Sequence, residues 1–297
     1  MLPPALPKPL SQKSSADITS ERIQTDTPLK LLEHSGKIKA MNRRTFATTL
    51  AGLAAAAGPA RPADSSRRTR FYMLETFELK NGTQAGRMHD WLGNTLLPKL
   101  AKIHEGPQIA LEAVIARHTP QLVLALGFSS FEDLSSTREK LAADKELAAS
   151  RQKLDEGPEP PFDSLTVTLL ESAAYSPEIV PEKRDKPRFF ELRVYHSPTA
   201  SQLRAVHERF AGPETKIFAR SGIHPVLYTS TLFGPNMPNL TYLIPFDSLG
   251  AREKAWDTFG ADPEWIKARK ESIDRGGKIV AVSEVSIYKA TPYSPVK

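Results

Sequence analysis

Every second residue of the segment Phe189–Tyr195 is charged or aromatic, and the residues between them are apolar. If this segment is a strand, Glu191, Arg193 and Tyr195 share one face with Phe189, because successive side chains of a strand point to opposite sides. We expect the apolar face to pack under helices and the polar face to line the interior of a barrel. A buried Glu–Arg pair among aromatic rings must satisfy its own charges or serve a ligand, so the pattern indicates either a small-molecule site or a structural ion pair.

Glu75 has the corresponding position in an earlier segment, Phe71–Phe77, and is a further ligand-binding candidate. His89 and His207 follow these two segments at equal distances. A histidine at both positions indicates a pair of metal or haem ligands, a general base, or two side chains that pack and hydrogen-bond at a helix–sheet edge.

The sequence lacks the signature residues of several other kinds of catalytic and metal site. The chain has no cysteine, which excludes disulfides, thiol nucleophiles and thiolate-held metal centres. It has no glycine-rich phosphate loop, no Gly-x-Ser-x-Gly and no His-Glu-x-x-His. We therefore expect no metal site, assign no catalytic residue and leave the cofactor open, with haem not excluded.

A constant spacing of 118 residues relates the first part of the chain to the second, which indicates a tandem duplication. The spacing holds without a gap for the following pairs: Phe71 and Phe189, His89 and His207, Pro107 and Pro225, Phe128 and Phe246, Asp144 and Asp262, Arg151 and Arg269, and the Tyr-Ser-Pro triplets at 175–177 and 293–295.

Each copy has the periodicities of a βαββαβ unit. In the first copy the expected elements are 71–79, 83–104, 109–117, 122–128, 131–154 and 163–172. In the second they are 189–196, 199–221, 225–232, 240–246, 249–273 and 278–288. The prediction is an α+β protein with two tandem ferredoxin-like βαββαβ domains of the dimeric α/β-barrel type, at 71–176 and 188–291, joined by a proline-rich linker at 177–187.

The second copy resembles the NIPSNAP family of the dimeric α/β-barrel superfamily. The residues that carry the resemblance are Phe190–Tyr195, Val206–Phe210, Ser221–Pro225, Tyr242–Ser248 and Asp262–Trp265. The first copy has the same layout but departs in detail, with Met73-Leu74-Glu75 in place of Glu-Leu-Arg. The resemblance implies the fold and leaves the activity open, because the family has no agreed enzymatic activity.

The positive charge of the chain is confined to its N-terminal part. Residues 1–40 carry a net charge of +2 and residues 41–70 a net charge of +5, whereas residues 71–297 carry −1. Arg43-Arg44-Thr45-Phe46 and the small apolar residues after it resemble a twin-arginine export signal that begins near Met41, too short to span a bilayer stably. We expect a disordered, mis-annotated extension at 1–40, a signal peptide and linker at 41–70, and a bacterial periplasmic or secreted protein.

Three functions remain open at this point. The favoured one is an exported protein that binds a small ligand or a partner through its duplicated barrel, with a homodimer as a further expectation. The second is a periplasmic enzyme, monooxygenase-like or haem-dependent, as in relatives of this superfamily. The third is a structural module for oligomerisation. The near-neutral charge of residues 71–297 argues against nucleic-acid binding.

Overall fold

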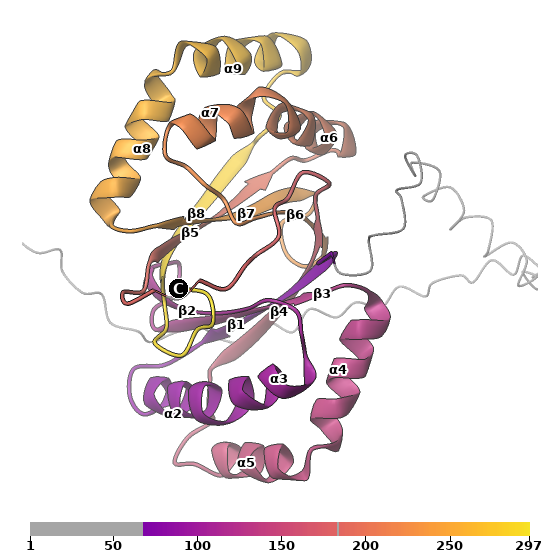
Figure 1. The fold of residues 1–297 in the computed structure, drawn as a ribbon, viewed down its shortest axis with the longest axis vertical. Helices are drawn as coiled ribbons and strands as arrows, with labels where there is room; N and C mark the ends of the chain where they lie inside the picture. The colour runs from indigo at the N-terminus through magenta and orange to yellow at the C-terminus, as the bar shows by residue number, and fades with distance from the viewer. Residues whose placement is uncertain (1–67, 183) are drawn as a thin grey trace, which may run out of the picture. The chain divides into compact units, whose positions relative to one another are not determined.

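The computed structural model describes residues 68–182 and 184–297, which form an α+β protein built around a closed barrel of eight antiparallel strands. The order of strands around the barrel is β1-β3-β2-β8-β5-β7-β6-β4, and β4 closes it against β1. Helices α2–α5 lie on one side of the barrel and α6–α9 on the other (Figure 1). The expected extension and most of the expected signal peptide, residues 1–67, lie outside the described residues.

The elements follow each other in the same order in both halves of the barrel. The first half contains β1 (Phe71–Glu78), α2 (Gln84–Trp91), the π-helical turn η3 (Leu92–Leu96), α3 (Leu97–Ile103), β2 (Gln108–Ile115), β3 (Gln121–Phe128), α4 (Phe131–Ala143), α5 (Lys145–Asp155) and β4 (Ser164–Ser172). The second half contains β5 (Phe189–His196), α6 (Ala200–Arg209), η4 (Phe210–Glu214), α7 (Thr215–Arg220), β6 (Leu227–Phe233), β7 (Asn239–Phe246), α8 (Leu249–Ala261), α9 (Pro263–Gly276) and β8 (Val282–Ala290).

The 118-residue spacing is visible in the register of the strands. Phe71 pairs with Phe128 across β1 and β3, and Phe189 pairs with Phe246 across β5 and β7. Strands β3 and β7 are buried at every residue, because one face of each lies in the barrel interior and the other lies under helices.

Helix ends and helix irregularities also recur at this spacing. Ser130 caps α4 and Ser248 caps α8, each accepting a hydrogen bond from a backbone N–H in the first turn. A π-helical turn interrupts the first helical region of each half at the same place, and its last residue is Leu96 in the first half and Glu214 in the second. Such turns often occur at functional sites, and these two direct their last residues toward the space between helices and sheet.

Two seams join the halves, β2 with β8 and β4 with β6. The Tyr-Ser-Pro triplet of each half crosses a seam: the Ser176 hydroxyl accepts a hydrogen bond from the Tyr228 backbone N–H at 3.0 Å, and the Ser294 hydroxyl accepts one from Ala110 at 3.0 Å. The repeated triplet therefore fastens each half to the other.

The barrel interior is filled by apolar side chains of both halves, and this corrects the expected orientation of β5. Phe190 is fully buried in that interior and Leu192 packs against it. Glu191, Arg193 and Tyr195 instead face the helices of the second half, where Arg252 and Trp256 contact Glu191. The alternation along the strand was predicted correctly, but the two faces were assigned to the wrong sides.

No helix within residues 68–182 and 184–297 combines the length and the apolar character that a membrane span needs.

Candidate functional site

The polar residues of β5 form a closed network between the sheet and α8. Glu191 is fully buried, and its carboxylate accepts hydrogen bonds from Arg193 Nη1 at 2.6 Å, Arg252 Nε at 2.6 Å and Trp256 Nε1 at 2.9 Å. The Arg193 guanidinium also lies over the Trp256 ring, 4.3 Å from its centroid. Because both carboxylate oxygens already accept hydrogen bonds, the network has the character of the structural ion pair that the sequence left open.

Aromatic rings fill the rest of the space under the second half of the sheet. The rings of Phe210, Phe218 and Tyr242 contact one another, and Phe218 also contacts Trp256 and Phe259. The Tyr242 hydroxyl donates a hydrogen bond to the Tyr195 hydroxyl at 2.7 Å. Tyr195, one of the predicted ligand-binding residues, is thus part of a packed core.

The first half has a cavity of about 490 Å³ in the matching place, between β1, β3 and β4 and the helices of that half. Sixteen residues line it: Met73, Glu75, Phe77, Trp91, Leu96, Leu100, Leu124, Leu126, Arg138, Leu141, Ala142, Leu147, Ala148, Arg151, Leu165 and Val167. Leu165 and Val167 on β4 are 40% and 48% exposed, so the cavity opens to solvent along that strand.

The cavity exists because aliphatic residues stand where the second half has aromatic ones. Positions 118 apart compare as follows, with the first-half residue given first: Leu92 and Phe210, Leu100 and Phe218, Leu124 and Tyr242, Leu141 and Phe259, Leu147 and Trp265. Each exchange removes a ring from the space between helices and sheet. Protein interiors are close-packed, so the removal of several rings in one place leaves room for a molecule.

Glu75 is the acidic group of this cavity. It stands at the position of Arg193, and it has no hydrogen bond within the described residues. Burial raises the pKa of the Glu75 carboxyl, while the positive charges of Arg138 and Arg151 act in the opposite direction.

Two arginines and a tryptophan complete the polar part of the wall. Arg151 lies over the Trp91 ring, 5.3 Å from its centroid, and forms an ion pair with Asp155 at 3.0 Å. Arg138 is exposed at the cavity wall and makes no ion pair within the described residues. Sequence reasoning missed these residues, although the 118-residue spacing pairs Arg138 with Trp256 and so marks one of the differences between the halves.

The two histidines lie at the two seams, away from the cavity. His89 Nδ1 shares a hydrogen bond with the Tyr293 hydroxyl at 2.9 Å, and its Nε2 lies 3.5 Å from the Glu112 carboxylate. His207 Nδ1 shares a hydrogen bond with the Tyr175 hydroxyl at 2.9 Å, and its Nε2 shares one with the Ser230 hydroxyl at 2.7 Å.

Both ring nitrogens of each histidine are therefore engaged, and neither offers a free nitrogen to a metal ion or a haem iron. Nor does any group of three or more His, Asp or Glu side chains in the described part of the chain lie close enough to share a metal ion.

Solved structures share the fold of this chain, and a family model matches its second half. A monooxygenase candidate from Fusobacterium nucleatum shares the fold, with a TM-score of 0.50, 10% identity, and coverage of 75% of this chain and 93% of that one. A NIPSNAP family protein of unknown function from Agrobacterium tumefaciens is 21% identical over 38% of this chain and 97% of its own, with a TM-score of 0.34. A chlorite dismutase mutant from Candidatus Nitrospira defluvii is 7% identical, with a TM-score of 0.44, over 76% of this chain and 93% of its own.

No curated protein sequence matches the chain. The family model described as NIPSNAP matches residues 190–295, which run from β5 to the Tyr-Ser-Pro triplet after β8. The network around Glu191 and the aromatic core lie inside the matched region, and the cavity around Glu75 lies before it. The chain is therefore similar to the NIPSNAP family over residues 190–295.

Proposed function

We propose that this protein binds a small, mainly apolar organic molecule in the cavity around Glu75. One observation carries the proposal: the first half leaves about 490 Å³ open where the second half is filled with aromatic rings. A volume of this size, with apolar walls and a few polar groups, is typical of sites for small organic ligands.

The lining of the cavity indicates how such a ligand lies. Leu100, Leu124 and Leu141 offer an apolar surface at its inner end, and Trp91 offers an aromatic one. The charged side chains of the lining are Glu75, Arg138 and Arg151, and Trp91 adds an indole N–H that has no hydrogen-bond partner within the described residues. The ligand thus has an apolar body and a single polar end, which a buried carboxyl and the guanidinium groups bind together.

The test uses 8-anilinonaphthalene-1-sulfonate as the probe, an apolar dye with one anionic end. We expect saturable binding to the full chain with one dye per chain, and energy transfer to the dye from Trp91. The double variant Leu100→Phe/Leu141→Phe, which introduces the rings of the second half, fills the cavity and should lose saturable binding. Ile115→Phe is the matched control, because it adds a ring at a residue that is 60% exposed on β2.

Two results would overturn the proposal. One is a wild-type chain that takes up dye without saturation. The other is a filled variant that remains folded, as judged by circular dichroism, and binds the dye as tightly as Ile115→Phe does. Trp91→Phe gives an independent check, since it should retain dye binding and lose most of the energy transfer.

We also infer that the two halves are tandem ferredoxin-like copies at 71–176 and 188–291 that arose by duplication. The shared register of β1–β3 and β5–β7 supports this inference. Export by the twin-arginine route and assembly into a homodimer remain proposals from the sequence. Sequencing the N-terminus of periplasmic protein and measuring its mass in the native state test both.

A further inference from the structure

A second cavity, of about 390 Å³, lies at the seam between β4 and β6 and contains the side chain of His207. Tyr175, His207 and Ser230 all line it, and they come from three separate elements: the segment after β4, α6 and β6. The cavity is separate from the one around Glu75, and none of its lining residues is shared with it.

The three side chains form a hydrogen-bonded row. Ser230 Oγ lies 2.7 Å from His207 Nε2, and the Tyr175 hydroxyl lies 2.9 Å from His207 Nδ1. In the tautomer that carries its proton on Nδ1, the imidazole donates to Tyr175 and accepts the hydroxyl proton of Ser230. A serine within hydrogen-bond distance of a histidine that a third group orients is the arrangement of an activated nucleophile.

The surroundings of the row favour this chemistry. Burial lowers the pKa of His207, so the ring is neutral at pH 7 and can accept a proton. Burial also raises the pKa of Tyr175 far above neutrality, which keeps that hydroxyl protonated. Ser230 is half-buried and thus within reach of a molecule in the cavity.

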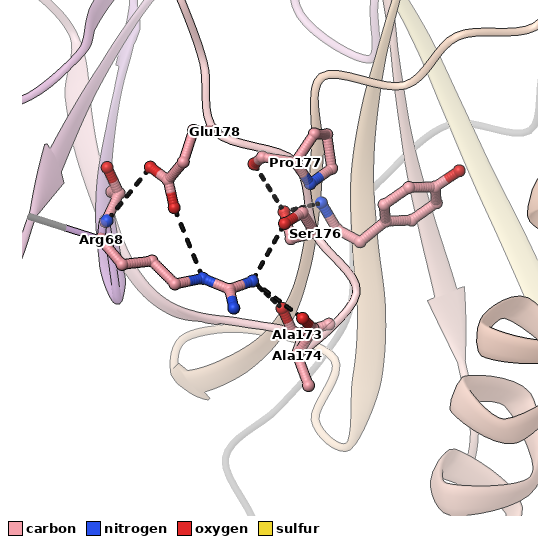
Figure 2. A network of polar contacts seen from close by, with 8 residues as sticks. Arg68, Ala173, Ala174, Ser176, Pro177 and Glu178 are labelled. Atoms are coloured by element: carbon pink, nitrogen blue, oxygen red, sulfur yellow. Dashed lines mark hydrogen bonds and ion pairs between the residues drawn. The ribbon is translucent and has the colours of Figure 1, made fainter. Parts of the chain in front are cut away.

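The segment that carries Tyr175 is held in place by Arg68. The Arg68 guanidinium donates hydrogen bonds to the backbone carbonyls of Ala173, Ala174 and Ser176, on both sides of Tyr175, and pairs with Glu178 at 3.4 Å (Figure 2). This fixes the backbone from which the tyrosine reaches the histidine. Hydrogen bonds of this kind hold the Tyr175 side chain, and through it the His207 ring, in one geometry.

Each seam offers a tyrosine hydroxyl to Nδ1 of its histidine, but only the seam of β4 and β6 offers a serine hydroxyl to Nε2. At the other seam His89 and Tyr293 are arranged in the same way, but Glu112 stands at the position of Ser230. A purely structural bond between the halves would be served by either residue. The difference assigns the seam of β4 and β6 a role that the seam of β2 and β8 does not share.

We propose that Ser230 is a nucleophile that His207 activates, and that the seam cavity accepts small carboxylic esters. Ser230 Oγ attacks the acyl carbon while its proton passes to His207 Nε2. The bond from the acyl carbon to the alcohol oxygen then breaks, and the alcohol leaves with that proton. Water attacks the acyl-serine, again losing a proton to His207, and the carboxylic acid departs as Ser230 regains its hydrogen. Arg204 lines the cavity and brings positive charge for the oxyanion of each step.

The first experiment treats the full chain with a fluorophosphonate probe and locates the label by peptide mass spectrometry. We expect the label on Ser230, and we expect His207→Gln to slow labelling by about 100-fold or more, the usual share of a general base. Tyr175→Phe should slow labelling as well, because Tyr175 is a positioning residue. Ser172→Ala is the control, since Ser172 lines the same cavity and lacks the contact with His207.

A second experiment remains informative if His207→Gln does not fold. Because the chain has no cysteine, Ser230→Cys and Ala174→Cys each create a single thiol. Ala174 lines the same cavity and is exposed, so burial does not slow the reaction of a thiol there. The thiol at 230 should react with iodoacetamide faster than the thiol at 174 at pH 7, since His207 promotes its ionisation. The proposal is overturned if Ser230 of the folded chain takes no label, if labelling is equally fast in folded His207→Gln, or if the thiol at 230 reacts no faster than the thiol at 174.

Discussion

Replacing Glu191 by alanine should destabilise the protein more than any surface substitution. The side chain is fully buried and its carboxylate holds two arginines and one indole N–H, so its removal leaves the Arg193 guanidinium, with only 16% of its side chain exposed, without its ion pair. Loss of one partner from a buried ion pair costs about 3–5 kcal/mol. For a folded region of this size, about 2–4 °C of melting temperature is lost per kcal/mol. Glu191→Ala should therefore melt roughly 6–20 °C below the wild type.

Urea unfolding followed by circular dichroism measures the same loss as a change in the free energy of unfolding. Glu264→Ala is the matched control, because Glu264 pairs with Arg220 at the surface, where both side chains are about half exposed. Surface pairs contribute about 0–1 kcal/mol. The double variant Glu191→Met/Arg193→Met should recover much of the loss, since two apolar side chains can replace a buried ion pair. A Glu191→Ala protein no less stable than Glu264→Ala would refute the structural role of the network.

Two further predictions concern stability. Burial raises the pKa of Glu214 from 4.5 to about 7 against the opposing effect of Arg209, so between pH 4.5 and 7 the folded chain holds a proton that the unfolded chain has released. The contribution of Glu214 to the free energy of unfolding should therefore fall as pH rises through this window and level off above pH 7. Glu214→Gln should remove this dependence on pH when urea unfolding is measured at pH 5, 6, 7 and 8. An unchanged dependence on pH would contradict the assignment to Glu214. Arg68→Ala should cost about 1–3 kcal/mol, because three backbone carbonyls lose their donor. Arg184→Ala is the control, because it removes a more exposed arginine from its ion pairs. It should cost less than about 1 kcal/mol. Equal effects of the two changes would show that Arg68 does not hold the segment after β4.

The elements and their spacing could be read from the sequence because they depend on local patterns. Alternation marked β5 at Phe189–His196, and Asp262-Pro263 marked the break between α8 and α9. The spacing of 118 residues also anticipated that His89 and His207 occupy matching places. Local pattern and repeat spacing are properties of the sequence itself, so these predictions do not depend on tertiary packing.

The sides of β5 could not be read from the sequence, because alternation defines two faces but does not say which face meets the helices. Glu191 lies on the helix side since Arg252 and Trp256, more than sixty residues later, supply its hydrogen bonds. The barrel interior receives Phe190 because apolar residues of all eight strands meet there, and the Tyr288 hydroxyl among them already donates a hydrogen bond to Gln121. The partners of Glu191 are tertiary contacts, which strand periodicity does not contain.

The cavity around Glu75 has a signal in the sequence, but only in the differences between the halves. The residues that the halves share indicate the duplication, whereas a ligand site in one half requires residues that differ. Leu100 opposite Phe218 and Leu124 opposite Tyr242 are such differences, and each replaces a ring by a smaller side chain. The positions of the cavity are therefore marked in the sequence by aromatic residues of the second half that have aliphatic counterparts 118 residues earlier.

The region that matches the NIPSNAP family model, residues 190–295, is the half whose space under the sheet is filled. Its Glu191 network and aromatic core fill the space between the sheet and the helices of that half. On the function proposed above, the packed core of the second half stabilises the barrel. The first half, in which Met73 and Glu75 replace the Glu–Arg pair, binds the ligand. Introducing the rings of the second half into the first, as in Leu100→Phe/Leu141→Phe, should thus fill the cavity and abolish binding. By contrast, Phe218→Leu in the second half should lower stability and leave binding in the first half intact.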